Sequence, residues 1–349
     1  MHALRMILVG TICLTAWGSW EAVAQPADVL LVDGGAQGAN DGSSWADAFT
    51  DLQDALAAAD ADATYVEIWI AAGTYHPAPP DLPGPPPPDR WATYQMVDGV
   101  ALYGGFAGWE TERSQRDFNT NRSILSGDLN DDDGPVDSSD DNSYHVVTVG
   151  ADIELVILDG LVIADGYTMA TEEIGGGGIY SFGNASIANC TFENNFCWGN
   201  GAAVYCQDGA LDVINCAFRA NQSTGYGNGV GSLGADVTIS SCEFVDNEWP
   251  APSCHFDGGA VRMLNAEFLR ESIGIQIESG SPVILNCNFE YNARGMVVGR
   301  DASPTIVDCT FFRDGDYPYY SYIRGGIDSE GAPVVVGCSF EECGSDGRG

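Results

Sequence analysis

The sequence predicts an all-β fold, a single-stranded right-handed parallel β-helix with a helical cap at its amino-terminal end. Two observations predict it: the motif Cys-x-Phe returns every 21 to 29 residues, and a β-branched residue stands three positions before each cysteine. A repeat of this length is typical of stacked strand units and is too short for a propeller blade. The motif contains Cys190, Cys216, Cys242, Cys287, Cys309 and Cys338, with Ala266 in one cysteine position, and Phe192, Phe218, Phe244, Phe268, Phe289, Phe311 and Phe340.

Each repeat needs corners in the chain. The cysteine and the phenylalanine share a face of a strand, whereas the β-branched residue would face the other way unless the chain bends between them. The residue before the cysteine is of a type that tolerates left-handed backbone angles. These residues are Asn189, Asn215, Ser241, Asn265, Asn286, Asp308 and Gly337. A second corner is expected at Asn195, Asn221, Asn247 and Asn292. Roughly eight to ten coils would then form a rod about 40–50 Å long.

The cysteines of the repeat are expected to be free thiols. Stacked Cβ atoms would lie about 4.8 Å apart, beyond the reach of a disulfide, so these cysteines act as small buried hydrophobic residues. Four others, Cys197, Cys206, Cys254 and Cys343, fall in turns or strand ends. For Cys197 and Cys206 both a disulfide and free thiols remain open.

The first 24 residues predict a secretory signal peptide. A basic start precedes a short apolar run, and small residues stand just before Gln25. The protein is therefore expected to be secreted or at the bacterial cell surface. Residues 25–349 contain no apolar stretch long enough to cross a bilayer, so we expect no membrane span after cleavage.

The remaining chain divides into three regions. Residues 25–125 are expected to form the cap and the first coils, with a proline-rich insertion at 76–89; residues 126–145 an acidic loop; and residues 146–349 the β-helix repeats. A helix is predicted over 44–60, with Ser44 as its cap and Asp47 completing a capping box. Such a helix would shield the open edge of the first coil. A strand is predicted over 66–70.

Two groups of motifs resemble known families. The "GGAV" stretches with FENN, FRAN, FVDN and FEYN resemble the repeats of polymorphic outer membrane proteins. The amino-terminal part, from "GANDGSSWADAF" to "DNSYHVV", resembles exported bacterial right-handed parallel β-helix proteins with a pectin-lyase-like fold. The resemblance implies this fold. Its members include adhesins, polysaccharide lyases and hydrolases.

Charge excludes one class of partner. The net charge is −37 and no lysine is present, so the chain lacks the basic surface that nucleic acids require. Calcium is the cofactor that the sequence suggests, because Asp128, Asn130, Asp132 and Asp133 alternate oxygen ligands around a turn. The loop departs from an EF-hand in its glycine position and lacks the closing glutamate. The alternative is a solvated acidic loop.

Aromatic residues near the second corners suggest contact with a polysaccharide or a cell-surface glycan. Aromatic faces can stack on sugar rings. The alternative is that they only cover the coil below. The candidates are Trp198, Trp249, Tyr317, Tyr319, Tyr320 and Tyr322.

The resemblance also raises the question of catalysis. Pectate-lyase-like chemistry needs an arginine base, and Arg294 and Arg324 hold like positions in adjacent coils. Their alternative role is charge balance on an acidic rod. We expect a structural or adhesive module that contacts glycans rather than an enzyme. The alternative function is that of a polysaccharide lyase or glycoside hydrolase.

Overall fold

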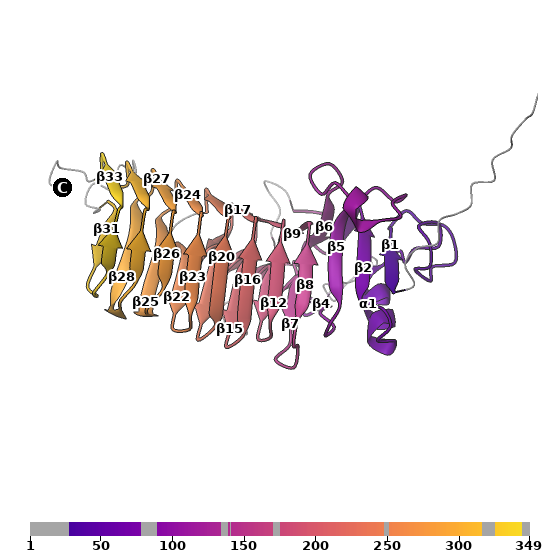
Figure 1. Cartoon of the computed structure of the whole chain (residues 1–349). Helices are drawn as coiled ribbons and strands as arrows, with labels where there is room; N and C mark the ends of the chain where they lie inside the picture. The colour runs from indigo at the N-terminus through magenta and orange to yellow at the C-terminus, as the bar shows by residue number, and fades with distance from the viewer. Residues whose placement is uncertain are drawn as a thin grey trace, which may run out of the picture.

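The structure, a computed structural model, describes residues 28–77, 89–133, 139, 141–169, 175–247, 251–315 and 325–343. The chain winds into a rod, with β1 and the helix at one end and β33 at the other (Figure 1). Each strand pairs in parallel with its equivalents in the neighbouring coils. This confirms the predicted parallel β-helix. The predicted signal peptide lies outside the described residues.

Three long sheets form the sides of the rod. The first sheet contains β1 (Val29–Val32), β2 (Glu67–Ala71), β5 (Ala101–Phe106), β8 (Val156–Asp159), β12 (Ala185–Ala188), β16 (Ala210–Ile214), β20 (Asp236–Ser240), β23 (Val261–Leu264), β26 (Val283–Leu285), β29 (Thr305–Val307) and β32 (Val334–Val336). The second sheet contains β3 (Gly73–Tyr75), β6 (Ser123–Ser126), β9 (Leu161–Ala164), β13 (Thr191–Glu193), β17 (Ala217–Arg219), β21 (Glu243–Val245), β24 (Glu267–Leu269), β27 (Asn288–Glu290), β30 (Thr310–Phe312) and β33 (Ser339–Glu341).

The third sheet carries the candidate site described below. It contains β4 (Tyr94–Gln95), β7 (Val147–Val149), β11 (Ile179–Ser181), β15 (Val204–Gln207), β19 (Val230–Leu233), β22 (Pro252–Asp257), β25 (Ile273–Gly280), β28 (Arg294–Ala302) and β31 (Ile327–Ser329). A short sheet at the corner contains β10 (Tyr167–Thr168), β14 (Phe196–Cys197) and β18 (Gln222–Ser223).

The phenylalanines of the repeat form a continuous stack in the interior. Neighbouring ring centroids from Phe192 to Phe340 lie 4.6 to 4.9 Å apart, and the rings are within 5° of parallel. This separation equals the spacing between paired strands, so the backbone pairing sets the stacking distance. All ten described cysteines are free thiols, which leaves Cys197 and Cys206 unbridged. Burial raises the pKa of the Cys197 thiol to about 12.

The first corner has the predicted left-handed backbone. Every residue before a repeat cysteine, from Asn189 to Gly337, has φ between 51° and 68°. The second corner is displaced by one position from the prediction. Its left-handed residue is the one before the asparagine, such as Ala220 with φ of 54°, and the side chain of Asn221 points into the rod.

The inward asparagines form a hydrogen-bonded ladder. Asn221 Nδ2 donates to the carbonyl of Phe192 at 3.0 Å, and Asn221 Oδ1 accepts from the backbone N–H of Asn195 at 3.2 Å. Asn247 repeats both bonds one coil further on, to Phe218 and to Asn221. The ladder thus satisfies corner backbone groups that would otherwise be buried without partners.

Two acids replace asparagine in this ladder. Glu271 is fully buried, and its Oε1 accepts from the backbone N–H of Asn247 at 3.2 Å and from its Nδ2 at 3.1 Å. Burial raises the pKa of Glu271 to about 8, and burial likewise raises the pKa of Asp314 to about 7. Both carboxyl groups therefore fit the interior best in their protonated form.

The helix of the cap is shorter than the predicted helix over 44–60. Helix α1 (Leu52–Ala61) begins after Asp51, whose side chain accepts from the backbone N–H of Gln53. The predicted Ser44–Asp47 contact forms, with Asp47 N–H donating to Ser44 Oγ at 3.1 Å, but it closes a separate turn. The helix starts later because Phe49 exchanges backbone hydrogen bonds with β1. A short 3-10 helix (Arg113–Gln115) follows β5. Among the described residues, no helix is long and apolar enough to span a bilayer.

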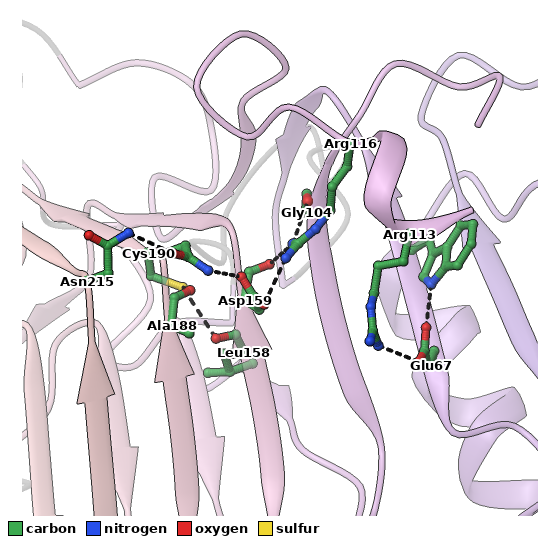
Figure 2. A network of polar contacts seen from close by, with 11 residues as sticks. Glu67, Gly104, Arg113, Arg116, Leu158, Asp159, Ala188, Cys190 and Asn215 are labelled. Carbon is green, nitrogen blue, oxygen red and sulfur yellow. Dashed lines mark hydrogen bonds and ion pairs between the residues drawn. The ribbon is translucent and has the colours of Figure 1, made fainter. Parts of the chain in front are cut away.

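An arginine ends a second polar ladder near this cap. Arg116 donates to the backbone oxygens of Gly104 and Asp159 and pairs with the Asp159 carboxylate at 2.8 Å (Figure 2). Asp159 Oδ1 accepts from Asn189, whose Oδ1 in turn accepts from Asn215, both at 2.7 Å. Asp159 is thus a structural residue of the corner.

The protonated state of Glu271 predicts a pH-dependent stability. The unfolded carboxyl has a pKa near 4.5, whereas the folded one has a pKa of about 8. The folded state therefore binds more protons between these values, and the stability present at about pH 4.5 is lost as the pH rises through about 8. We expect wild-type protein to lose about 4 kcal/mol across this range and Glu271→Gln to lose less. Denaturant unfolding at both pH values measures this. Glu267→Gln, an exposed change on the same coil, is the control, and an unaltered pH dependence in Glu271→Gln would contradict the assignment.

The network around Arg116 predicts that two arginine variants differ in stability. Arg116 and Asp159 expose only 12% and 16% of their side chains. Removal of one partner would leave a largely buried charge, so Arg116→Ala should lower the free energy of unfolding by about 3 kcal/mol. Arg113, which pairs with Glu67 at 2.6 Å and is 45% exposed, is the matched control; Arg113→Ala should cost about 0–1 kcal/mol. Equal losses in the two variants would show that the network does not hold the corner.

Candidate functional site

The predicted calcium loop brings three carboxylates together. Asp128, Asp132 and Asp141 each place an oxygen within 4.8 Å of the other two. Asp128 is buried and also accepts backbone N–H groups from the loop, Asp132 at 3.2 Å among them. The other two predicted ligands have supporting contacts, since Asn130 donates to Asp141 at 2.5 Å and the Asp133 carboxylate accepts from Asn142 at 2.8 Å. Oxygen ligands in this arrangement suit a divalent cation such as calcium.

One of the predicted aromatic residues is described. Trp198 is 49% exposed and packs edge-on against Phe196, with ring centroids 6.1 Å apart. Thr224 donates to the Trp198 carbonyl at 2.8 Å, so the corner loops of these two coils lie against each other. The remaining candidates fall outside the described residues: Trp249, Tyr317, Tyr319, Tyr320 and Tyr322.

The structure describes one of the two predicted arginines, Arg294. Arg294 lies 3.9 Å from the carboxylate of Asp328 one coil further on, as charge balance between coils would require. Other arginines pair with acids in the same way, for example Arg219 with Glu243 at 2.6 Å. Arg324 lies outside the described residues, so the alignment of two guanidinium groups stays a prediction.

A groove on the outer face of the third sheet was not predicted. It has a volume of about 540 Å³ and draws its lining from β15, β19, β22, β25, β28 and two corner loops. The strand register places Asp257 opposite Ser279, and Ser279 opposite Asp301. The groove therefore has a polar row that runs along the rod, in which the Ser279 hydroxyl donates to Asp257 at 2.8 Å.

A β-bulge adds a further acid to this row. Between Ile277 and Ser279, strand β25 has one residue more than β22, and the extra residue is Glu278. A bulge of this kind redirects a side chain. Glu278 Oε1 accepts from Gln276 at 2.5 Å and lies 3.6 Å from His255 Nε2. The bulge thus brings a carboxylate beside the one histidine that lines the groove.

His255 is held between two elements. Its ring stacks on Tyr226 with centroids 4.4 Å apart, and its side chain is 9% exposed. Burial lowers the pKa of His255 although Glu278 raises it, so the ring is neutral at neutral pH. Nε2 has no hydrogen-bond partner among the described residues. A bound group could supply the partner that this nitrogen lacks.

Tyr226 reaches the groove on a loop that depends on a glycine. Its backbone N–H donates to Asn200 at 3.1 Å, its carbonyl accepts from Gly201 at 2.7 Å, and its side chain is 46% exposed. A Cβ atom at Gly231, the outward position of β19, would lie 2.9 Å from the nitrogen of Gly201. The loop can therefore rest on the strand only because position 231 has no side chain.

A second hollow, on the outer face of the second sheet, suits a ligand less well. Its volume is about 380 Å³. The charged side chains in it already form ion pairs, Arg122 with Glu193 and Arg219 with Glu243, both at 2.6 Å. By contrast, no ion pair with an arginine occupies Asp257, Glu278 or Asp301 among the described residues. The groove of the third sheet is the better candidate.

The alternation of inward and outward residues along the strands of the third sheet could have indicated one row of this groove. In "VYCQ", "SCHFD" and "IQIESG", the inward positions are apolar or small, and the outward ones include Tyr205, His255 and Gln276, which share one row. The bulge and the overlying loop leave no such signal.

Comparison with known proteins supports the fold. The family model described as "Right handed beta helix region" matches residues 175–344, which contain the groove. No curated protein and no solved structure matches the chain. With the parallel pairing of the three sheets, this match identifies an all-β protein with a right-handed parallel β-helix.

Proposed function

We propose that the chain is an exported or cell-surface β-helix protein that binds glycans in the groove of the third sheet. The observation that carries the proposal is the pairing of exposed apolar faces with polar groups. Tyr226 and Leu233 are 46% and 42% exposed, and they lie beside Asp257, Glu278 and Asp301. Aromatic faces that stack on sugar rings, with oxygens that bind hydroxyl groups, are what a saccharide needs. The predicted signal peptide and the repeats that resemble polymorphic outer membrane proteins support export.

A row of acids also favours one alternative. Asp257 and Asp301 are separated by two strand spacings, about 9.6 Å between backbones. Inverting glycoside hydrolases hold two carboxyl groups about 6.5–9.5 Å apart. Hydrolysis in the same groove is therefore the second candidate function. It predicts release of new reducing ends, whereas a binding groove only retains the polymer.

Binding to immobilised polysaccharides tests the proposal. We expect Tyr226→Ala to weaken retention about tenfold, which corresponds to about 1.4 kcal/mol, because the exposed ring would be lost. Trp198→Ala tests whether the neighbouring corner loop extends the binding face. Trp109→Ala is the control, since Trp109 is 63% exposed and does not line the groove. Retention that none of the groove variants reduces would refute the assignment. Release of soluble products, lost in Asp301→Asn, would favour the hydrolase.

We also propose that calcium binds the cluster of Asp128, Asp132 and Asp141. Bound calcium would neutralise three adjacent carboxylates, so calcium at about 100 times its Kd should stabilise the folded state by about 2.7 kcal/mol. Asp141→Asn should abolish most of this gain. Asp131→Asn, the same change at an exposed position of the same loop, should keep it. Thermal unfolding with calcium or with a chelator measures the difference. If calcium shifts both variants equally, the cluster is not the site.

A further inference from the structure

The charges in the groove specify a class of saccharide. Resting on the proposed function, we infer that the groove takes saccharides with free amino groups, such as oligomers of glucosamine, in preference to uronic acid polymers. Among the described residues, its lining includes Asp257, Glu278 and Asp301 and no arginine. The one basic side chain in the lining, His255, is neutral at neutral pH because burial lowers its pKa. A polyuronate would meet mainly like charge there, whereas an ammonium group would meet carboxylates that pair with no arginine among the described residues.

The contact between His255 and Glu278 indicates where one amino group would bind. The distance from His255 Nε2 to Glu278 Oε1, 3.6 Å, is too long for a direct hydrogen bond. Both groups are fixed, the imidazole by its stack on Tyr226 and the carboxylate by its bond from Gln276. An ammonium group beside them would donate to the carboxylate and could donate to the neutral imidazole. It would thus supply the buried nitrogen with the partner that the described residues do not provide.

The spacing of the row suits a linear polymer that lies along the rod. Asp257 and Asp301 stand two coils apart with Ser279 between them, so these two acids lie about 9.6 Å apart along the rod. This repeat is close to the length of a disaccharide. Alternate sugars of one chain could therefore place amino groups at successive acids, while the hydroxyl of Ser279 contacts the unit between.

The groove acids do not form a compact cluster of carboxylates. Three carboxylates near enough to share an ion occur among the described residues at Asp128, Asp132 and Asp141, in the acidic loop. The groove acids are not part of that group. Their charge is instead left for a ligand that spreads over several coils, which fits a row of amino groups better than a single cation.

Three oligosaccharides that share one β-1,4 backbone, compared with a uronic acid oligomer, provide the test. Binding of glucosamine, N-acetylglucosamine and glucose oligomers, all β-1,4-linked, and of galacturonate oligomers would be measured by calorimetry at about pH 6, where the amino groups are charged. We expect the glucosamine oligomer to bind at least about tenfold more tightly than its acetylated form, and the galacturonate oligomer to bind most weakly. Glu278→Gln and Asp301→Asn should remove the preference for the free amine and keep binding of the neutral oligomers.

Controls separate the groove from the general acidity of the rod. Asp212→Asn removes the same charge from an exposed position on β16, outside the groove, and should preserve the preference. If Asp212→Asn weakens amine binding as much as the groove variants do, the attraction is general and the inference fails. If all oligomers bind equally and Tyr226→Ala abolishes binding, glycan binding stands and the preference for amines is refuted. If no oligomer binds, the proposed function fails, and the inference fails with it.

Discussion

One left-handed residue at the first corner of each coil fixes the geometry on which the rest of the rod depends. It turns the chain so that the β-branched residue before the corner and the cysteine and phenylalanine after it all face inward. Asn189, Asn215 and their equivalents adopt this conformation at little cost, because a short polar side chain tolerates it. Equivalent residues then superpose from coil to coil. The strand spacing alone places the ring centroids of Phe218 and Phe244 4.6 Å apart.

The interior could be predicted from the sequence because it repeats. Most inward positions have similar chemistry in successive coils, so the register of the stack follows from alignment of the repeats. The second corner was placed one residue late for a physical reason. Its left-handed position holds Asn194 and Asp246 in two coils, but in others it holds Ala220, Arg270 and Tyr291, which have no preference for that conformation. The buried amide ladder imposes it, since Asn221 and Asn247 gain hydrogen bonds only when the preceding residue turns.

The candidate groove could not be predicted in the same way. Its outward residues do not repeat, and two of its contacts depend on local irregularities. Glu278 reaches His255 because a bulge redirects it, and Tyr226 reaches the same ring from a loop that Gly231 admits. These residues are distant in sequence, and no periodicity relates them. The acidic cluster could be predicted in part. The alternating acids indicated Asp128 and Asp132, whereas Asp141 is distant in sequence and no pattern relates it to them.

The position of the groove follows from how the rod tolerates change. Inward substitutions disturb two neighbouring coils at once, so specific chemistry is confined to the outer face. There, strands β22, β25 and β28 lengthen from 6 to 8 to 9 residues. One residue of β25 and one of β28 interrupt the ladder with the strand before. Such interruptions sacrifice backbone pairing, and proteins retain them where a side chain must be aimed. Most described arginines pair with acids of other coils, whereas no arginine among the described residues pairs with Glu278 or Asp301 on the lengthened strands. In the proposed glycan groove, these two carboxylates would carry the charge that meets the ligand.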